Sequence, residues 1–463
     1  MEIAMKNLII ILVGILILSA CSDFLEEKSQ DEVIVSTVAD YSQFLLGSAY
    51  GMPGYDVLYL LDDDVELDES LYYGDANNAY AVDYFGYFTW QPDMWERGMK
   101  IIDLYENVYS LLKGVNATLD GIDEATGSDV EREYVKAEAY GLRGFYYYLL
   151  VNLYGEPYHD NKTSLGVPLK LTAGLVENGL VRNTVEEVYT QIVKDLNVSA
   201  ELFEKNPKRV GNYRLNITSV YILLSRVYLY MEQWENAIKM AGRAIETAEG
   251  LTNYTSISSS TFYMPTYAHS EVEWRYGNGQ LKYGYVPSQE LLSKYGDNDC
   301  RKKFWFNVSG KLLKKNPDYA EGMGPTNTLR ISEAYLNRAE AYAQMGKTNE
   351  ALADLNELRR CRIIGYEDIS VEDVTDLLNE VRLERRLELC YDEQRWFDLR
   401  RYGMPSISHK YKARKADSWL MFTLKEKDPL YTIPFSTTML MNNNRLEQNA
   451  SAYESERNLI LNE

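Results

Sequence analysis

Apolar residues recur at every third or fourth position in several long stretches of the chain, the spacing that places them on one face of an α-helix. Three such stretches cover about residues 104–122, 131–154 and 184–203. The second is rich in aromatic residues and ends at Gly155. The third follows Asn183 or Thr184, either of which can cap a helix N-terminus, and it has acidic residues in its first turn. The pattern therefore predicts a mostly α-helical protein.

Two further stretches share one arrangement of small and apolar residues. The matching positions are Tyr228, Glu232, Ala237, Ala241 and Ala244 in the first copy, and Tyr342, Gly346, Ala351, Leu355 and Leu358 in the second. This is the tetratricopeptide pattern, in which small residues let two antiparallel helices approach closely. Each pair leaves an apolar face that must stack on a neighbour, so further pairs are expected among the other helices.

Two other stretches lack helical periodicity. Residues 252–325 are rich in Tyr, Ser, Gly and Pro, and residues 52–95 contain an acidic run that is followed by many aromatic residues. Both predict loops and short strands, and long irregular segments in a compact protein are usually functional. The acidic run lacks the glycine and the closing glutamate of an EF-hand, so a solvated loop is favoured over a Ca²⁺ site. No cofactor and no metal is expected.

The N-terminal residues resemble a bacterial export signal. Lys6 precedes an apolar run from Leu8 to Leu18 of about a dozen residues, whereas a membrane-spanning helix needs roughly 20. Leu18-Ser-Ala-Cys21 resembles a lipobox, in which the cysteine is diacylated (for example with palmitate) and becomes the mature N-terminus. Two acyl chains are enough for stable membrane anchoring. Whether translation starts at Met1 or Met5 stays open.

The composition of the chain argues against several classes of function. The net charge of −21 disfavours nucleic acid and anionic membrane surfaces as partners. The chain has four cysteines, including Cys21, and three widely spaced histidines, which favours neither a disulfide framework nor a transition-metal centre. Tyrosine is abundant, with 39 copies, and its flat face and polar tip suit both buried packing and ligand surfaces.

Six motifs, in order along the chain, resemble those of the SusD/RagB family of nutrient-uptake lipoproteins of Bacteroidota. They begin at Gly144, Arg182, Pro287, Leu329, Glu384 and Ile433. The strongest runs from Leu329-Arg-Ile-Ser-Glu-Ala-Tyr335 through Ala339-Glu-Ala-Tyr342 to Arg359. Each motif alone is weak, but the ordered set is specific. The acidic residues that follow Cys21 also resemble the signal that directs such lipoproteins to the cell surface.

The resemblance implies a SusD-like fold, which is a mostly α scaffold of tetratricopeptide-like helical pairs with long irregular loop regions and minor β structure. We expect a signal peptide at 1–20, a lipidated N-terminus and tether at 21–50, and a single domain at 51–463. Within this domain the expected parts are a helical scaffold at about 96–250 and 326–402, loop regions at about 51–95 and 251–325, and a C-terminal segment at 403–463.

The resemblance also implies a function without catalysis. A lipid-anchored protein of the outer membrane, facing the cell exterior, would capture oligosaccharide and deliver it to a SusC-like TonB-dependent transporter barrel. Peptide capture by the same arrangement is the first alternative. A glycan-acting enzyme with two paired carboxylates, or a helical-repeat scaffold for protein partners, are further alternatives.

Sugar recognition combines stacking on aromatic rings with polar groups that bind hydroxyls. In the first loop region we expect Trp90 as the stacking platform, Asp93 as a hydroxyl partner, and Asp62 or Asp64 as a second polar contributor. The alternative is that Trp90 fills a gap against the helical scaffold, because tryptophan is usually well buried. Solvent accessibility of the aromatic side chains distinguishes these alternatives.

In the second loop region Tyr263, Tyr276 and Tyr283 are the candidate ligand contacts, with neighbouring aromatic residues completing an arc. The charged residues between Glu384 and Arg401 could suggest an anion-binding catalytic site. Their helical spacing favours instead an ion-pair network that fixes the last helices to the core.

Overall fold

The structure is a computed structural model that describes residues 35–51, 58–72, 76–97, 104–207, 210–258, 269–277, 284–307, 315, 327–371 and 373–457. Residues 37–463 form one compact unit. The predicted signal peptide and Cys21 lie outside the described residues. Among the residues that are described, no helix has both the length and the apolar character needed to cross a bilayer.

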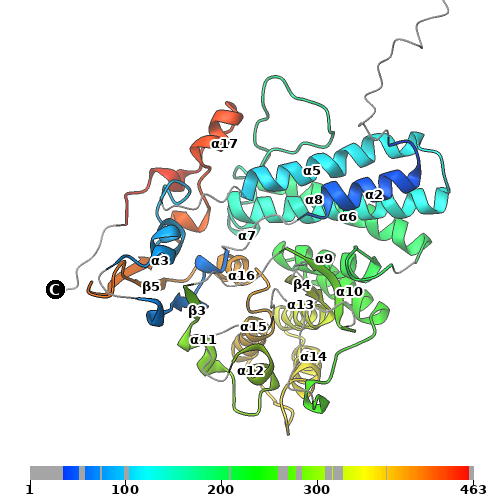
Figure 1. Cartoon of the computed structure of the whole chain (residues 1–463). Coiled ribbons are helices and arrows are strands. Elements are labelled where there is room, and N and C mark those ends of the chain that lie inside the picture. Colours follow the sequence, from blue (N-terminus) through cyan, green and yellow to red (C-terminus); the bar gives the residue numbers. More distant parts are fainter. Residues whose placement is uncertain are drawn as a thin grey trace, which may run out of the picture. The chain divides into compact units, whose positions relative to one another are not determined.

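The predicted mostly α-helical fold is confirmed (Figure 1). The longer helices are α2 (Val38–Ala49), α5 (Leu104–Gly121), α6 (Asp129–Tyr154), α8 (Val185–Lys205), α9 (Ile217–Tyr230), α10 (Trp234–Thr247), α13 (Ile331–Gln344), α14 (Thr348–Arg360) and α15 (Val374–Glu388). The shorter ones are α3 (Ala79–Asp83), α4 (Phe85–Phe88), α7 (Tyr158–Asn161), α11 (Gln289–Lys294), α12 (Cys300–Trp305), α16 (Arg395–Arg401) and α17 (Thr437–Asn442).

Helices α2, α5, α6 and α8 pack side by side (Figure 1). Thr184 is the N-cap of helix α8. Its hydroxyl accepts a hydrogen bond from the backbone N–H of Glu187, and the Glu187 carboxylate accepts one from the Thr184 N–H. This capping box decides between the two predicted caps. Helix α2 corrects the predicted domain boundaries, because residues 38–49 pack into the body instead of continuing the tether to residue 50.

The two copies of the tetratricopeptide pattern form the helical pairs α9–α10 and α13–α14. Each pair turns through one residue with left-handed backbone geometry, Glu232 with φ of 57° and Gly346 with φ of 70°. Helix α10 packs against α13, so the two pairs stack although they are far apart in sequence. The stacking buries Ala237, Ala241 and Leu355 completely.

Within the described ranges, the β structure consists of three two-stranded antiparallel sheets. The strands are β1 (Val65–Leu67) with β3 (Tyr285–Pro287), β2 (Val272–Tyr276) with β4 (Asn327–Arg330), and β5 (Ile407–Tyr411) with β6 (Leu420–Leu424). The first sheet joins the two predicted loop regions, with Val65 opposite Pro287 and Leu67 opposite Tyr285. The predicted loop regions are therefore packed together rather than independent.

The predicted ion-pair network of the last helices is confirmed. Arg385 binds Asp398 at 2.8 Å, Arg401 binds the same carboxylate at 2.8 Å, and Arg401 also binds Glu340 on α13 at 2.6 Å. Burial by itself raises the pKa of Asp398, but the two guanidinium groups hold it below its usual value. These groups are almost fully buried, so the network joins α13, α15 and α16 inside the body.

Candidate functional site

Trp90 does not form an exposed stacking platform. Its side chain is fully buried, its indole N–H donates to the backbone carbonyl of Leu61 at 3.0 Å, and its ring stacks on His409 with centroids 4.3 Å apart. Its φ of 49° is unusual for a bulky residue, so the surrounding packing must hold this conformation. The expectation of an exposed Trp90 is wrong, and the alternative that it fills a gap against the scaffold is the observed arrangement.

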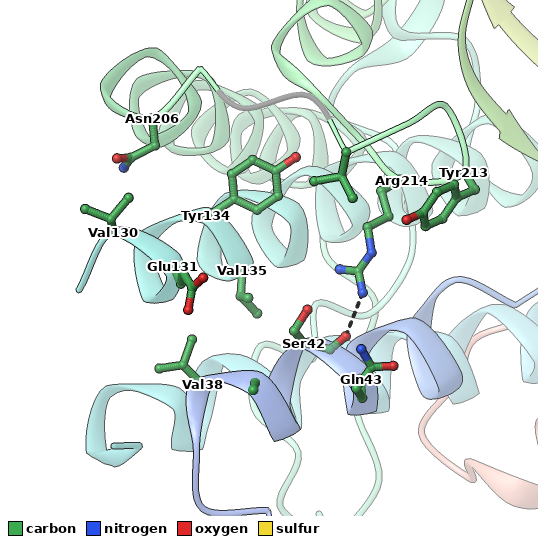
Figure 2. Close-up of a pocket in the computed structure, with 12 residues that line it drawn as sticks. Val38, Ser42, Gln43, Val130, Glu131, Tyr134, Val135, Asn206, Tyr213 and Arg214 are labelled. Atoms are coloured by element: carbon green, nitrogen blue, oxygen red, sulfur yellow. Dashed lines mark hydrogen bonds between the residues drawn. The ribbon is translucent and has the colours of Figure 1, made fainter. Parts of the chain in front are cut away.

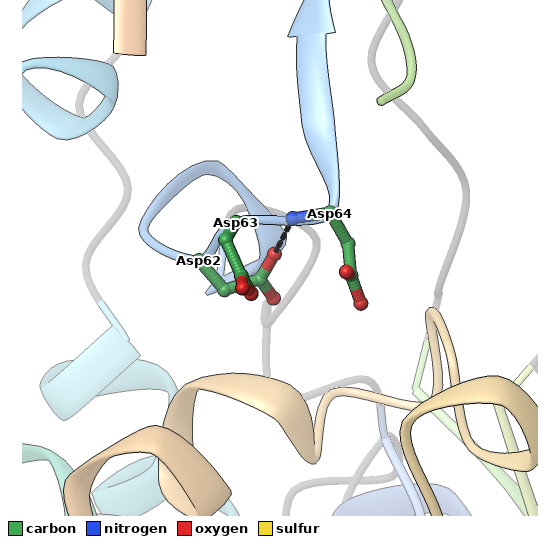
Figure 3. Close-up of side chains that lie close together, drawn as sticks. All are labelled: Asp62, Asp63 and Asp64. Carbon is green, nitrogen blue, oxygen red and sulfur yellow. Dashed lines mark hydrogen bonds between the residues drawn. The ribbon is translucent and has the colours of Figure 1, made fainter. Parts of the chain in front are cut away.

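Within the acidic run the side chains of Asp62, Asp63 and Asp64 lie close together (Figure 3). Asp62 and Asp64 are buried, and Asp62 accepts a hydrogen bond from the backbone N–H of Asp64. Asp64 binds Arg386 at 2.7 Å, and Asp63 binds Arg395 at 2.7 Å. Asp62 and Asp64 are thus corrected from candidate hydroxyl partners to parts of a buried polar cluster.

The electrostatics of this cluster follow from burial and from the two arginines. Burial raises the pKa of Asp62, and the neighbouring carboxylates of Asp64 and Asp63 raise it further. Burial also opposes ionisation of Asp63, but Arg395 and Arg386 lower its pKa to about 2. In the described part of the chain, these three aspartates are the group whose oxygens lie close enough together for a metal ion, within 4.8 Å. Arg395 and Arg386 already pair with Asp63 and Asp64.

Asp93 keeps a partly exposed carboxylate, but it binds Arg97 at 2.7 Å. In the second loop region Tyr276 is buried, where its ring stacks on Trp274 with centroids 5.0 Å apart. Tyr276 is therefore corrected from a ligand contact to a core residue. Tyr263 and Tyr283 lie outside the described residues.

A different tryptophan reaches the surface. All seven tryptophans lie in described residues, and Trp419 is the most exposed of them at 36%. It ends the loop between β5 and β6, a hairpin in which Ile407, His409 and Tyr411 face inward by strand alternation. Sequence reasoning did not select Trp419. The available signal was an indole that follows a short polar run, Lys415-Ala-Asp-Ser418, directly before an alternating strand.

Trp419 belongs to a small aromatic and basic cluster. The ring of Tyr72 meets it edge to face, with centroids 6.4 Å apart and an interplanar angle of 77°. The Nζ atom of Lys412 lies 4.4 Å from the centroid of the Trp419 ring and 5.1 Å from that of Tyr72. The Tyr72 hydroxyl donates to the Lys412 carbonyl at 2.7 Å, and burial raises the pKa of Tyr72. Cation–π contacts of this kind hold the ammonium and the rings in one arrangement.

Helix α3 extends this surface. The backbone N–H of Asn78 donates to the carbonyl of Ala413 at 2.8 Å, which fixes the start of α3 against the hairpin loop. The Asn78 side chain caps α3 by accepting from the N–H of Tyr80 at 3.1 Å, and Tyr80 is 39% exposed. We call the surface formed by Tyr72, Tyr80, Lys412 and Trp419 the hairpin face. It combines two exposed rings, those of Tyr80 and Trp419, with the buried ring of Tyr72 and the ammonium of Lys412.

A cavity of about 300 Å³ lies between α2, α6 and residues 206–214 (Figure 2). Its cation, Arg214, binds Glu138 at 2.8 Å and donates to the carbonyl of Ser42 at 3.1 Å. Val130, Tyr134 and other largely apolar side chains line the rest. The cavity therefore has a mainly apolar lining and a cation that is already paired.

These features describe a scaffold of helical pairs that carries a partly exposed aromatic surface. Residues 23–229 match a family described as "Starch-binding associating with outer membrane", and residues 244–454 match the SusD family. The chain belongs to the SusD/RagB family, which confirms the resemblance inferred from its motifs. Proteins of this family bind carbohydrate and are not catalytic, so the chain is a binding protein and not an enzyme.

Individual relatives have low sequence identity to this chain but align with most of its length. SusD-like protein P38 of Formosa agariphila is 22% identical over 378 residues, which cover 64% of this chain and 71% of that protein. A SusD superfamily structure from Bacteroides fragilis has a TM-score of 0.71 at 20% identity and covers 90% of this chain and 100% of its own. A SusD-like carbohydrate binding protein from Bacteroides vulgatus has a TM-score of 0.66 at 19% identity and covers 89% of this chain and 97% of its own. The two structural similarities show the fold.

Proposed function

We propose that this protein is a surface lipoprotein that captures oligosaccharide at the hairpin face and delivers it to a TonB-dependent transporter of the outer membrane. Capture is a binding event, so it requires a rigid exposed surface rather than a reactive group. Helices of the scaffold supply the rigidity, and family membership supports a nutrient-binding role.

The observation that carries the proposal is the exposure of Trp419. Five of the other six tryptophans are buried and the sixth, Trp234, is half-buried. Burying an indole is favourable, so an exposed one beside a second ring is a surface available for stacking. Lys412, Arg414 and Asp417 lie beside Trp419 in the sequence and offer donors and acceptors for sugar hydroxyls.

Anchoring and delivery rest on the N-terminal segment. Lipidation at Cys21 would hold the body at the outer membrane, and the acidic residues after Cys21 resemble a surface-export signal. A transporter barrel in the same membrane would then receive the bound glycan directly. This part of the proposal is supported by the sequence motif and by the family description, which associates the family with the outer membrane.

The test is the affinity of the purified body for a panel of polysaccharides, measured by affinity electrophoresis and isothermal titration calorimetry. Trp419→Ala is expected to weaken binding about tenfold, because a stacked ring contributes about 1.4 kcal/mol. Trp234→Ala is the matched control, since Trp234 is the other tryptophan with partial exposure and lies at the start of α10. It is expected to bind as the wild type does.

Three results would contradict the proposal. The wild type could bind no polysaccharide, Trp419→Ala could bind as tightly as the wild type, or both tryptophan variants could lose affinity equally. Binding of peptides in preference to glycans, with the same loss in Trp419→Ala, would keep the site and replace the cargo by peptide.

A further inference from the structure

The hairpin that presents Trp419 is basic within a strongly acidic protein. The whole chain has a net charge of −21, yet residues 410–417 contain Lys410, Lys412, Arg414 and Lys415 against the single acid Asp417. Asp417 binds Arg414 at 3.0 Å, and this hydrogen bonding lowers the pKa of Asp417. One acid on the loop is thus already paired, and the remaining cations are in excess.

Lys412 differs from the other cations in its surroundings. Its side chain is only 9% exposed, and its Nζ faces the rings of Trp419 and Tyr72. Among the residues that the structure describes, no carboxylate lies within 4 Å of this Nζ and no acceptor receives a hydrogen bond from it. The aliphatic stem of Lys412 is therefore packed against the body, while its ammonium contacts two aromatic rings and has no hydrogen-bonded anion among the described residues.

The buried position of Lys412 is not explained by a role in protecting the edge of the β5–β6 sheet. Edge strands often carry lysines that point to solvent and prevent pairing with another chain, and the exposed Lys410 on β5 fits that role. Strand alternation would place Lys412 on the same outer side as Lys410. Lys412 is instead buried beside the equally buried Tyr411, so the alternation ends and the ammonium is directed onto the aromatic rings.

From this geometry we infer that the hairpin face binds an acidic glycan, with Lys412 pairing with a uronate carboxylate or a sulfate ester of the sugar that stacks on Trp419. The inference rests on the proposed glycan capture and names the class of glycan. With a neutral sugar the ammonium would have only the carboxylate of Asp417, which lies beyond salt-bridge distance, whereas a sugar anion completes a charge-assisted pair beside the stacking ring. An anionic lipid surface is disfavoured, because the net charge of −21 repels it and because Arg414, one of the four basic residues, is already paired with Asp417.

The experiment compares matched polymers that differ only in charge. Polygalacturonate is measured against its fully methyl-esterified form, and dextran sulfate against dextran, by calorimetry with the wild-type body. At least one charged polymer is expected to bind about tenfold or more tightly than its neutral counterpart, since a charge-assisted hydrogen bond is worth about one to two orders of magnitude in affinity. This preference is expected to disappear in 1 M salt, where the screening length is about 3 Å.

Variants separate Lys412 from the general charge of the protein. Lys412→Met keeps the length of the side chain and is expected to lose the preference for the charged polymer while binding the neutral one unchanged, and Lys412→Arg is expected to retain the preference. Lys347→Met is the matched control, because its Nζ also lies over a ring, 5.8 Å from the centroid of Tyr342, at a turn of the helical scaffold. It is expected to behave as the wild type does.

The outcomes distinguish this inference from the proposed function. Equal binding of charged and neutral polymers, or a preference that survives Lys412→Met, would overturn the inference and leave glycan capture standing. No binding of any polymer would overturn both. Binding of phosphatidylglycerol vesicles with loss in Lys412→Met, and no preference for acidic glycans, would replace the glycan by a lipid surface.

Discussion

Replacing Asp63 by asparagine tests whether the acidic run stabilises the fold. Its carboxylate receives two hydrogen bonds from Arg395, at 2.7 and 2.8 Å, and lies 3.3 Å from Arg386. Asp63→Asn keeps the size of the side chain but leaves both guanidinium groups without this counter-charge. Both arginines are largely buried, so solvent replaces the lost partner poorly.

The magnitude follows from the pKa of Asp63. A carboxyl whose pKa falls from 3.8 to about 2 on folding stabilises the native state by about 2.5 kcal/mol when it is ionised. Because the folded-state pKa is the lower one, this contribution is complete well above pH 4 and is lost as the pH falls toward 2. It is about 1.3 kcal/mol at pH 3, roughly half of its value at pH 7.

The assay is urea unfolding of the wild type and Asp63→Asn at pH 7 and pH 3, followed by circular dichroism. The difference in the free energy of unfolding is expected to be about 2.5 kcal/mol at pH 7 and about half of that at pH 3. Asp297→Asn is the control, because Asp297 pairs with Lys302 in a fully exposed position, and no measurable change is expected. A difference below about 0.5 kcal/mol at pH 7, or one that is independent of pH, would refute the reasoning.

Two further predictions concern packing and anchoring. Gly114→Ala places a Cβ about 2.5 Å from the carbonyl oxygen of Ser48, so α2 and α5 must separate. Urea unfolding should show that the free energy of unfolding falls by about 1–3 kcal/mol. Gly242→Ala on α10 is the control and should not destabilise the protein, because the atom nearest to its added Cβ is 3.7 Å away. An equal effect of the two substitutions would contradict the close approach. Cys21→Ser should release the protein from outer-membrane fractions, whereas Cys361→Ser should leave fractionation unchanged. Retention of Cys21→Ser in the membrane would exclude this cysteine as the anchor.

The local sequence pattern was sufficient to predict the helices of the scaffold. The predicted helices at about 104–122, 131–154 and 184–203 correspond to α5, α6 and α8, and both tetratricopeptide pairs were placed by their small residues. Such elements depend on contacts three or four residues apart and on caps such as Thr184, which are visible in the sequence itself. The prediction was wrong at 38–49, where α2 is joined to the body by packing that short-range pattern does not record.

The candidate site was predicted less well, because exposure is decided by distant residues. Trp90 lies in an aromatic-rich stretch and Trp419 follows a short polar run, and neither local sequence records what covers the indole. The first is covered by Leu61 and His409, and the second is contacted by Tyr72 and Lys412 on one side and remains partly open. The acidic run was taken for a solvated loop for the same reason, since Arg386 and Arg395, which neutralise it, lie more than 300 residues away in the sequence.

The sequence by itself determined the family and the helical pairs, and it predicts a lipid-anchored export signal, because these depend on residue order and short-range spacing. Only the tertiary structure decided which aromatic residues reach solvent and which charges are paired. The physical reason is that an indole or an ammonium is buried, stacked or free according to its neighbours in space, and the antiparallel hairpin that carries Lys412 and Trp419 acquires those neighbours only when Tyr72 and α3 pack against it.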